Sequence, residues 1–118
     1  GENPLYLPQA KLYASCCAIG PCFATPETVG DPHDLQVRCA ILRDGKELFS
    51  GESSTAAMAR TCDDLADWLH RHNVIPNMTT VLTGTAIVPP PDVTLQPGDV
   101  VTISIEKIGL LENVVVVV

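Results

Sequence analysis

A single lysine stands in an almost uncharged run near the start of the chain. Between Asn3 and Pro26 the only permanently charged side chain is Lys11, within "LPQAKLYASCCAIGP". A poorly solvated ammonium group interacts far more strongly with a carboxylate or enolate oxygen than one in water does. Tyr6 and Gln9 stand close by in sequence and would add hydrogen-bond donors. An exposed strand lysine, whose methylene stem covers apolar surface, is the other interpretation, and both are open at this point.

Thr83 is a second candidate because it precedes a glycine in "VLTGT". Gly84 would let a ligand approach the backbone closely, so that the threonine hydroxyl and nearby amides face it. A threonine at the junction of a strand and a turn, with no ligand, accounts for the same pattern. The motif alone does not choose between them.

The carboxylates and histidines do not form a complete catalytic or metal-binding set in this sequence. Asp63, Asp64 and Asp67 crowd one stretch, where helix capping accounts for them. Glu-x-Glu and Asp-x-Asp are absent, although a hard cation such as Mg²⁺ needs convergent oxygen ligands. His70 and His72 are two residues apart on an expected helix, so they face different directions and are interpreted as solvated or core-edge residues.

The five cysteines are expected to be reduced, mostly buried thiols of a cytosolic protein. Cys16 and Cys17 are adjacent, which suits mutual bridging poorly. A zinc site would need Cys-x-x-Cys pairs or cysteine and histidine clusters, and the chain offers only the spacing from Cys17 to Cys22. No base for a nucleophilic thiol can be identified, and His33 is expected in a loop. A thiol or zinc protein is therefore the weaker alternative.

A β-hairpin is the clearest local pattern among the elements that must position these residues. Apolar and polar residues alternate from Leu35 to Leu42, Asp44-Gly45 follows, and Lys46 to Ser50 leads back out. Alternation on either side of Asp-Gly is typical of a hairpin whose turn tolerates positive φ.

One convincing helix is expected in "TCDDLADWLHRHN". Thr61 is placed to cap it, and Asp64 three residues later makes a capping-box variant. Asn73 would end it. The residues at helical spacing form one mostly apolar stripe: Leu65, Trp68, Leu69 and His72.

The remaining elements are expected to be short. Pro26 suits the first position of a single helical turn, and extended pieces are expected over residues 11–17 and 22–25. Residues 79–85 read as a strand entering a glycine-containing turn. Pro97-Gly98-Asp99 would turn the chain before a strand from Val100, and a bend over residues 108–111 would precede the terminal valines. The sum is one helix on a strand-rich, antiparallel or mixed body.

General composition restricts the class of partner. The net charge is −7 and the seven basic residues are scattered, which argues against a nucleic-acid surface. No segment has the length of a membrane span or resembles a signal peptide. The 118 residues suit one domain or one lobe of a larger one. Since no initiator Met is present, we expect the sequence to begin inside a longer gene product.

Four segments together resemble the fumarylacetoacetate hydrolase family. They are "LPQAKLYASCCAIGP", "VLTGT", "LQPGDVVTISIEKIG" and "GLLENVV". They are similar to the family's lysine segment ending in Gly-Pro, its Thr-Gly strand, its Pro-Gly-Asp turn and its closing Ile-Gly-x-Leu-x-Asn. Each is modest alone, but four in the right order are specific. "NPLYLPQAK" is similar to the branch that acts on 2-keto-3-deoxy sugar acids and related diketo acids.

The resemblance implies a fold, a chemistry and a cofactor. The fold would be mostly β with one main helix (α+β), a mixed β-roll or β-clip-like structure. Residues 1–118 would be the C-terminal part of a single catalytic domain, incomplete at the N-terminus. Family members hydrolyse C–C bonds or dehydrate, isomerise or decarboxylate 2-oxo acids. Mg²⁺ or Mn²⁺ chelates the substrate there, and its glutamate and aspartate ligands would lie before Gly1, so this chain alone would bind no metal tightly.

The resemblance also assigns roles to individual residues. Lys11 matches the family lysine beside metal and substrate, and would stabilise enolate or carboxylate charge. Ser15 falls where the family has a small hydroxyl residue near that lysine, and Thr83 matches the threonine that touches substrate. Tyr6 and Gln9 are weaker assignments to the same substrate site.

Two interpretations of the whole chain follow. It is part of a cytoplasmic, metal-dependent hydrolase or lyase that acts on a small 2-oxo or diketo acid, commonly as a homodimer, with no nucleic-acid or membrane partner. Alternatively, it is a β-rich scaffold or binding module that lacks the metal carboxylates and the chemistry.

Overall fold

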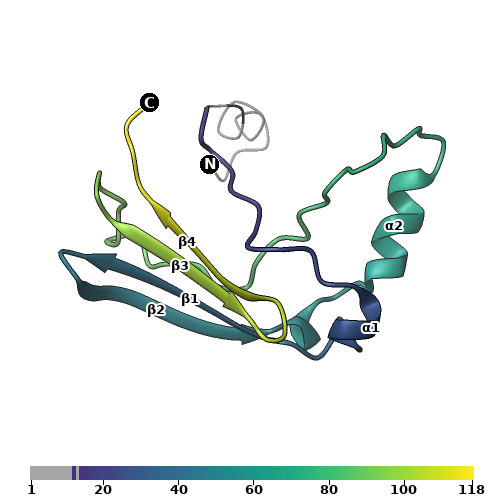
Figure 1. Ribbon diagram of the computed structural model, residues 1–118, viewed down its shortest axis with the longest axis horizontal. Coiled ribbons are helices and arrows are strands. Elements are labelled where there is room, and N and C mark those ends of the chain that lie inside the picture. Colours follow the sequence, from purple (N-terminus) through teal and green to yellow (C-terminus); the bar gives the residue numbers. More distant parts are fainter. Residues whose placement is uncertain (1–11, 13) are drawn as a thin grey trace.

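A computed structural model of the protein describes residues 12 and 14–118 (Figure 1). Its centre is one four-stranded sheet in the order β2-β1-β3-β4, with every neighbouring pair antiparallel. The described fold is therefore mostly β with one main helix, as predicted. Its elements are α1 (Pro26–Val29), β1 (Gln36–Arg43), β2 (Lys46–Ser54), the 3-10 helix η3 (Thr55–Ala57), α2 (Cys62–His70), β3 (Val100–Ile105) and β4 (Gly109–Val114).

The predicted hairpin is present as β1 and β2. Asp44 has a φ of 52° and Gly45 a φ of 74°, so both central residues of the turn adopt the left-handed conformation. Asp-Gly tolerates this conformation, and the turn matches the twist of the paired strands. The register shifts once, between Ile41 and Leu42.

The second hairpin, β3 and β4, turns earlier than predicted. The bend occupies residues 106–108, and β4 already begins at Gly109 opposite Ile105. Lys107 takes a φ of 61°, which places the left-handed residue of the turn ahead of the predicted bend at 108–111. The prediction of a strand, a bend and a second strand is confirmed, but its boundary was wrong.

The helix α2 begins as predicted and ends earlier. The Thr61 hydroxyl accepts the Asp64 N–H, and the Asp64 carboxylate accepts the Thr61 N–H, which completes the capping box. The helix ends at His70, and His72 rather than Asn73 takes a left-handed φ, of 58°. Figure 1 shows α2 standing apart from the sheet, and none of its residues is buried.

The hydrophobic core of the described chain is small and lies against the middle of β1. Ala40 and Ile41 of β1 are buried, and Leu35 just before the strand is buried with Val29 of α1. The Leu35 N–H donates to the Thr55 hydroxyl at 2.9 Å, which ties the start of β1 to η3.

Two expectations for the described residues were wrong. Residues 79–85 form no strand, because a strand needs a paired neighbour and no described segment pairs with them. The cysteines are not mostly buried: Cys16, Cys17 and Cys22 are exposed, and the other two are half-buried. Apolar composition around these thiols did not bring them into the core. Within the described chain, no helix has the length and apolarity needed to cross a bilayer.

Candidate functional site

The structure describes two of the five predicted site residues. Lys11, Tyr6 and Gln9 lie outside the described residues. Ser15 lies in a tight turn with a φ of 57°, and its side chain is exposed. Thr83 is exposed in the connection between α2 and β3. In the part of the chain that the structure describes, no hydrogen bond or ion pair joins these two residues, so their convergence on one ligand stays a prediction.

The segment that follows Ser15 rests on the second hairpin. The Cys22 thiol donates to the Ile108 carbonyl at 3.3 Å. A methyl group at Gly20 would lie 3.3 Å from Leu111 Cδ1, so the backbone there lies close to β4. The chain leading away from Ser15 is thus held along one edge of the sheet.

Thr83 belongs to a long connection, residues 71–99, that contains no helix or strand. Single hydrogen bonds close its turns, some within the backbone, such as the Val93 N–H to the Pro90 carbonyl at 3.0 Å, and some from side chains. The Thr79 hydroxyl donates to the Pro76 carbonyl at 2.8 Å, and the Thr85 hydroxyl accepts the Ile87 N–H at 3.0 Å. Gly84 has a φ of 92°, and no atom of the described residues beyond its chain neighbours lies within 4 Å of where a methyl group would lie. Within the described part of the chain the backbone at Gly84 is therefore open, and contact of a ligand with it stays a prediction.

A buried ion pair fixes the end of this connection. Arg43 Nε donates to Asp99 Oδ1 and Arg43 Nη2 to Asp99 Oδ2, each at 2.8 Å. The Gln96 N–H donates to the same carboxylate at 2.8 Å, and Arg43 Nη2 also donates to the Thr94 carbonyl at 2.8 Å. Asp99 is only 1% exposed. The guanidinium first, and the backbone N–H second, lower the pKa of Asp99 to about 2.

This pair explains the Pro-Gly-Asp motif as a structural device. The Asp99 N–H donates to the Gln96 carbonyl at 3.0 Å, and Gly98 between them has a φ of 91°, as a turn with Pro-Gly at its centre requires. Sequence reasoning found the turn and missed the partner on β1. The available signal was Arg43, a cation at the end of an apolar strand in "CAILRDG".

His33 supports the start of α2. The Cys62 N–H donates to His33 Nε2 at 3.0 Å, and the His33 N–H donates to Asp31 Oδ1 at 2.8 Å. The residue lies in a turn, as predicted, and its ring is engaged in holding the helix. It is a structural histidine in the described chain.

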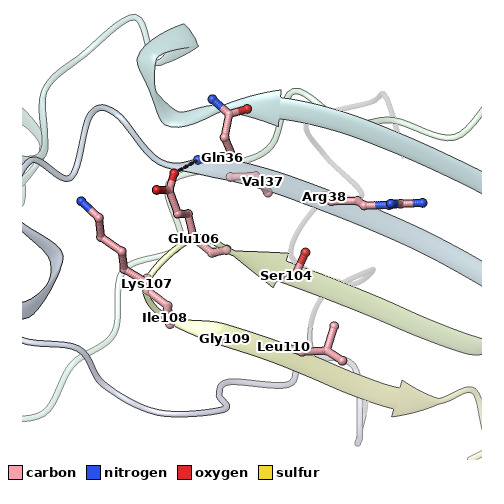
Figure 2. A pocket seen from close by; sticks show the side chains of 10 residues that line it. Gln36, Val37, Arg38, Ser104, Glu106, Lys107, Ile108, Gly109 and Leu110 are labelled. Atoms are coloured by element: carbon pink, nitrogen blue, oxygen red, sulfur yellow. Dashed lines mark hydrogen bonds between the residues drawn. The ribbon is translucent and has the colours of Figure 1, made fainter.

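The hollow shown in Figure 2 lies where β1 begins and the second hairpin turns. Its polar groups hold the fold together. The Gln36 N–H donates to Glu106 Oε2 at 3.3 Å, and Lys107 Nζ donates to the Val29 carbonyl at 3.0 Å. A second hollow lies on the sheet face around Thr102. Neither hollow is lined by Ser15 or Thr83, so neither forms the predicted substrate site.

The described residues do not fit a metal ion by themselves. In residues 12 and 14–118, no three histidine, cysteine, aspartate or glutamate side chains come together as ligands. Asp64 is used in the α2 cap, and hydrogen bonds with Thr61 lower the pKa of its carboxyl. Because Mg²⁺ needs several convergent oxygen ligands, no magnesium site is assigned to this part of the chain.

Comparison with protein families and curated proteins gives a consistent set of relatives. Residues 2–116 match the family model described as fumarylacetoacetate (FAA) hydrolase C-terminal. The chain is 51% identical over 113 residues to a probable 2-keto-3-deoxyxylonate dehydratase of Haloferax volcanii, covering 96% of this chain and 39% of that protein. It is 44% identical over 110 residues to the 2-dehydro-3-deoxy-D-arabinonate dehydratase of Saccharolobus solfataricus, covering 93% of this chain and 37% of that one.

The fold has a solved counterpart. A 2-keto-3-deoxy-D-arabinonate dehydratase complexed with magnesium and 2,5-dioxopentanoate matches with a TM-score of 0.92 and 43% identity. The match covers 96% of this chain and 40% of that one. The described sheet and helices therefore match part of the fold of that dehydratase. The chain spans about two fifths of the length of the proteins it matches.

Proposed function

The chain belongs to the fumarylacetoacetate hydrolase family, and we propose that it contributes to a metal-dependent enzyme that removes water from a 2-keto-3-deoxy sugar acid. One observation carries the proposal: the 0.92 TM-score at 43% identity to a dehydratase with magnesium and 2,5-dioxopentanoate bound. Mg²⁺, when bound in such an enzyme, supplies positive charge to the oxygens of a 2-oxo acid.

Loss of water from such an acid requires protein side chains that stabilise an enolate. Loss of water from a 2-keto-3-deoxy acid starts with removal of a proton from C3, next to the keto group, and leaves enolate charge on the keto oxygen. The hydroxyl on C4 then leaves with a proton as water, which forms a C3=C4 double bond conjugated to the keto group. When the acid has five carbons, transfer of a proton from C5 to C3 turns this enone into an enol at C4 and C5, which tautomerises to an aldehyde at C5. A cation and hydrogen-bond donors aimed at the keto and carboxylate oxygens lower the energy of that enolate.

Lys11 is proposed as the cation that stabilises this charge. Thr83 and Ser15 are proposed to donate hydrogen bonds to the substrate, with Tyr6 and Gln9 as weaker candidates for the same role. The exposed Thr83 hydroxyl and the open backbone at Gly84 support this assignment, because both are available to a ligand. A homodimer in the cytoplasm, with a small 2-oxo acid as the molecule bound, remains part of the proposal.

The test is an assay of the full-length gene product with 2-keto-3-deoxy-D-arabinonate in the presence of Mg²⁺. We expect a product lighter than the substrate by one molecule of water, and loss of the reaction when the metal is chelated. A β-diketo acid is the matched alternative substrate, since C–C hydrolysis of it gives two shorter acids. If the enzyme cleaved the diketo acid and did not dehydrate 2-keto-3-deoxy-D-arabinonate, it would be a hydrolase and the dehydratase proposal would be wrong.

The 118-residue chain by itself is the second sample. We expect little turnover and weak Mg²⁺ binding by calorimetric titration, because the described residues bring together no set of metal ligands. Tight, stoichiometric binding of Mg²⁺ together with a 2-oxo acid would contradict this expectation. Full turnover by the chain alone would contradict it as well.

A further inference from the structure

A glycine in the middle of β2 makes room for a side chain of the connection that carries Thr83. Gly51 lies opposite Cys39 of β1. A methyl group at Gly51 would lie 2.7 Å from Ile87 Cγ2 and 3.2 Å from Phe49 Cζ. Packed carbon atoms do not approach as closely as the first of these distances. Ile87 therefore occupies the space that the side chain of any other residue at position 51 would take.

The strand itself does not require this glycine. Gly51 lies inside a regular antiparallel pair, and its backbone is outside the left-handed region that favours glycine. Glycine also weakens a strand interior, because it adds conformational freedom to the unfolded chain and has no side chain to pack. Close approach of Ile87 is thus the feature of the described structure that accounts for glycine here.

Ile87 differs from its neighbours in the connection. It is half-buried, whereas Leu82 is 70% exposed and Val88 73% exposed. The Ile87 N–H donates to the Thr85 hydroxyl at 3.0 Å, so the backbone from residue 85 to 87 forms one tight turn. A displacement of Ile87 would therefore be passed to Thr85, and through it to Thr83 and Gly84.

We propose that Gly51 and Ile87 form a positioning contact that sets the distance between the sheet and the Thr83-Gly84 turn. The contact holds the Thr83 hydroxyl and the adjacent backbone where they meet the carboxylate or keto oxygen of a 2-keto acid. This inference rests on the proposed function, since it takes Thr83 to contact the substrate. Gly51 and Ile87 touch no reacting atom and act through the connection.

The kinetic test is Gly51→Ala in the full-length enzyme. We expect the KM for 2-keto-3-deoxy-D-arabinonate to rise by about tenfold with a smaller change in kcat, because the added methyl group displaces a binding residue. Ser53→Ala, two positions along the same strand face, is the matched control and should leave KM unchanged. Ile87→Leu in the Gly51→Ala background removes the Cγ2 methyl group and should bring KM back toward the original value.

Hydrogen exchange provides a readout that does not depend on turnover. In Gly51→Ala we expect faster amide exchange over residues 79–92, and unchanged exchange over β1 and β3. If the loop exchange and KM of this variant equal those of the unaltered protein, the positioning contact is disproved. Faster exchange over the whole sheet would also overturn it, because the substitution would then act on general stability.

The two proposals can fail separately. If the unaltered enzyme does not dehydrate the substrate, the proposed function fails. Faster loop exchange in Gly51→Ala, reversed by Ile87→Leu, would still support the contact. If the enzyme is active and Gly51→Ala changes neither readout, the proposed function stands and the contact fails.

Discussion

The sheet and the connections that carry the candidate site residues are held together in different ways. Three antiparallel ladders join the four strands, and Asp44-Gly45 suits the left-handed turn of the first hairpin. The connection between α2 and β3, by contrast, is closed by isolated turn hydrogen bonds from side chains and backbone, and apolar residues outside the sheet such as Leu12 and Met78 are 79% and 87% exposed. Stability is therefore concentrated in the sheet, and the proposed chemistry in segments that rest on it.

The comparison extends to how each region uses charge. Where the connection enters β3, the carboxylate of Asp99 is buried and fully engaged by Arg43 of β1 and a backbone N–H. In the proposed site, Lys11 would keep its charge available for a substrate oxygen. A charge that is fully paired stabilises the fold, whereas a charge that meets its partner only on binding stabilises the bound state. Substitutions at the two places should consequently affect different measurements.

The largest effect is expected for Lys11→Ala in the full-length enzyme. Loss of one group that stabilises an oxyanion costs on the order of 2–4 kcal/mol in the transition state, which corresponds to a roughly 30- to 900-fold fall in kcat. The midpoint of thermal unfolding should stay within a few degrees. Lys46→Ala, which removes an exposed lysine of β2, is the control and should leave turnover unchanged. Equal turnover in Lys11→Ala and the control would remove Lys11 from the mechanism.

The next effect concerns stability, for Asp99→Asn. The two carboxylate oxygens of Asp99 accept three hydrogen bonds, whereas asparagine has only one side-chain oxygen. The asparagine NH2 group would therefore face a hydrogen-bond donor at a buried position. We expect the midpoint of thermal unfolding to fall by roughly 10 °C. Arg38→Ala is the control, because Arg38 is 54% exposed and its carboxylate partners lie at 3.4 and 3.9 Å. If the unfolding midpoint of Arg38→Ala fell as far as that of Asp99→Asn, burial of the Asp99 carboxylate would be unimportant for stability.

Lowering the pH should remove the stabilising contribution of the same ion pair in the unaltered protein. The folded-state pKa of Asp99 is lowered from 3.8 to about 2, so its stabilising contribution is complete above the unfolded-state pKa and is lost as the pH falls through about 2. We expect the unfolding midpoint to decline between about pH 4 and pH 2, and to decline less in Asp99→Asn. Asp64 and Glu27, whose pKa values are also lowered by hydrogen bonds, should leave a residual slope in that variant. Identical slopes would show that Asp99 carries no pH-dependent stability.

The elements that sequence reasoning predicted well are those with a local cause. Asp44-Gly45 determines its own turn, and Thr61 with Asp64 determines the start of α2, since each contact spans at most three residues. The partner of Asp99 lies 56 residues away on β1, so the local pattern around Arg43 could indicate a paired cation but could not identify Asp99 as its partner. The strand predicted at 79–85 was wrong for the same reason, because the residue types of one segment do not supply a second strand to pair with.

Local pattern made Lys11 and Thr83 separate candidates, and only the resemblance assigned them to one site. Lys11 and Thr83 are 72 positions apart, and composition alone could not place them at one ligand. Exposure of Thr83 and the open backbone at Gly84 agree with a ligand-facing turn. The contact between Gly51 and Ile87 could not be predicted from the sequence, because a glycine within a strand pattern does not identify the side chain that packs against it.

The smallest effect is expected where a locally determined element stands apart from the sheet. Thr61→Ala removes the hydroxyl that accepts the Asp64 N–H at 3.0 Å and should lower the free energy of local unfolding of α2 by about 1 kcal/mol, the usual value for a lost N-cap. Because α2 buries no residue, the loss should appear as faster amide exchange confined to residues 62–70, with β1 and β3 unchanged. Thr61→Ser keeps the hydroxyl and is the matched control. If Thr61→Ala accelerated exchange in the sheet as strongly as in α2, the two regions would be one cooperative unit, and the separation of stability from chemistry would not hold.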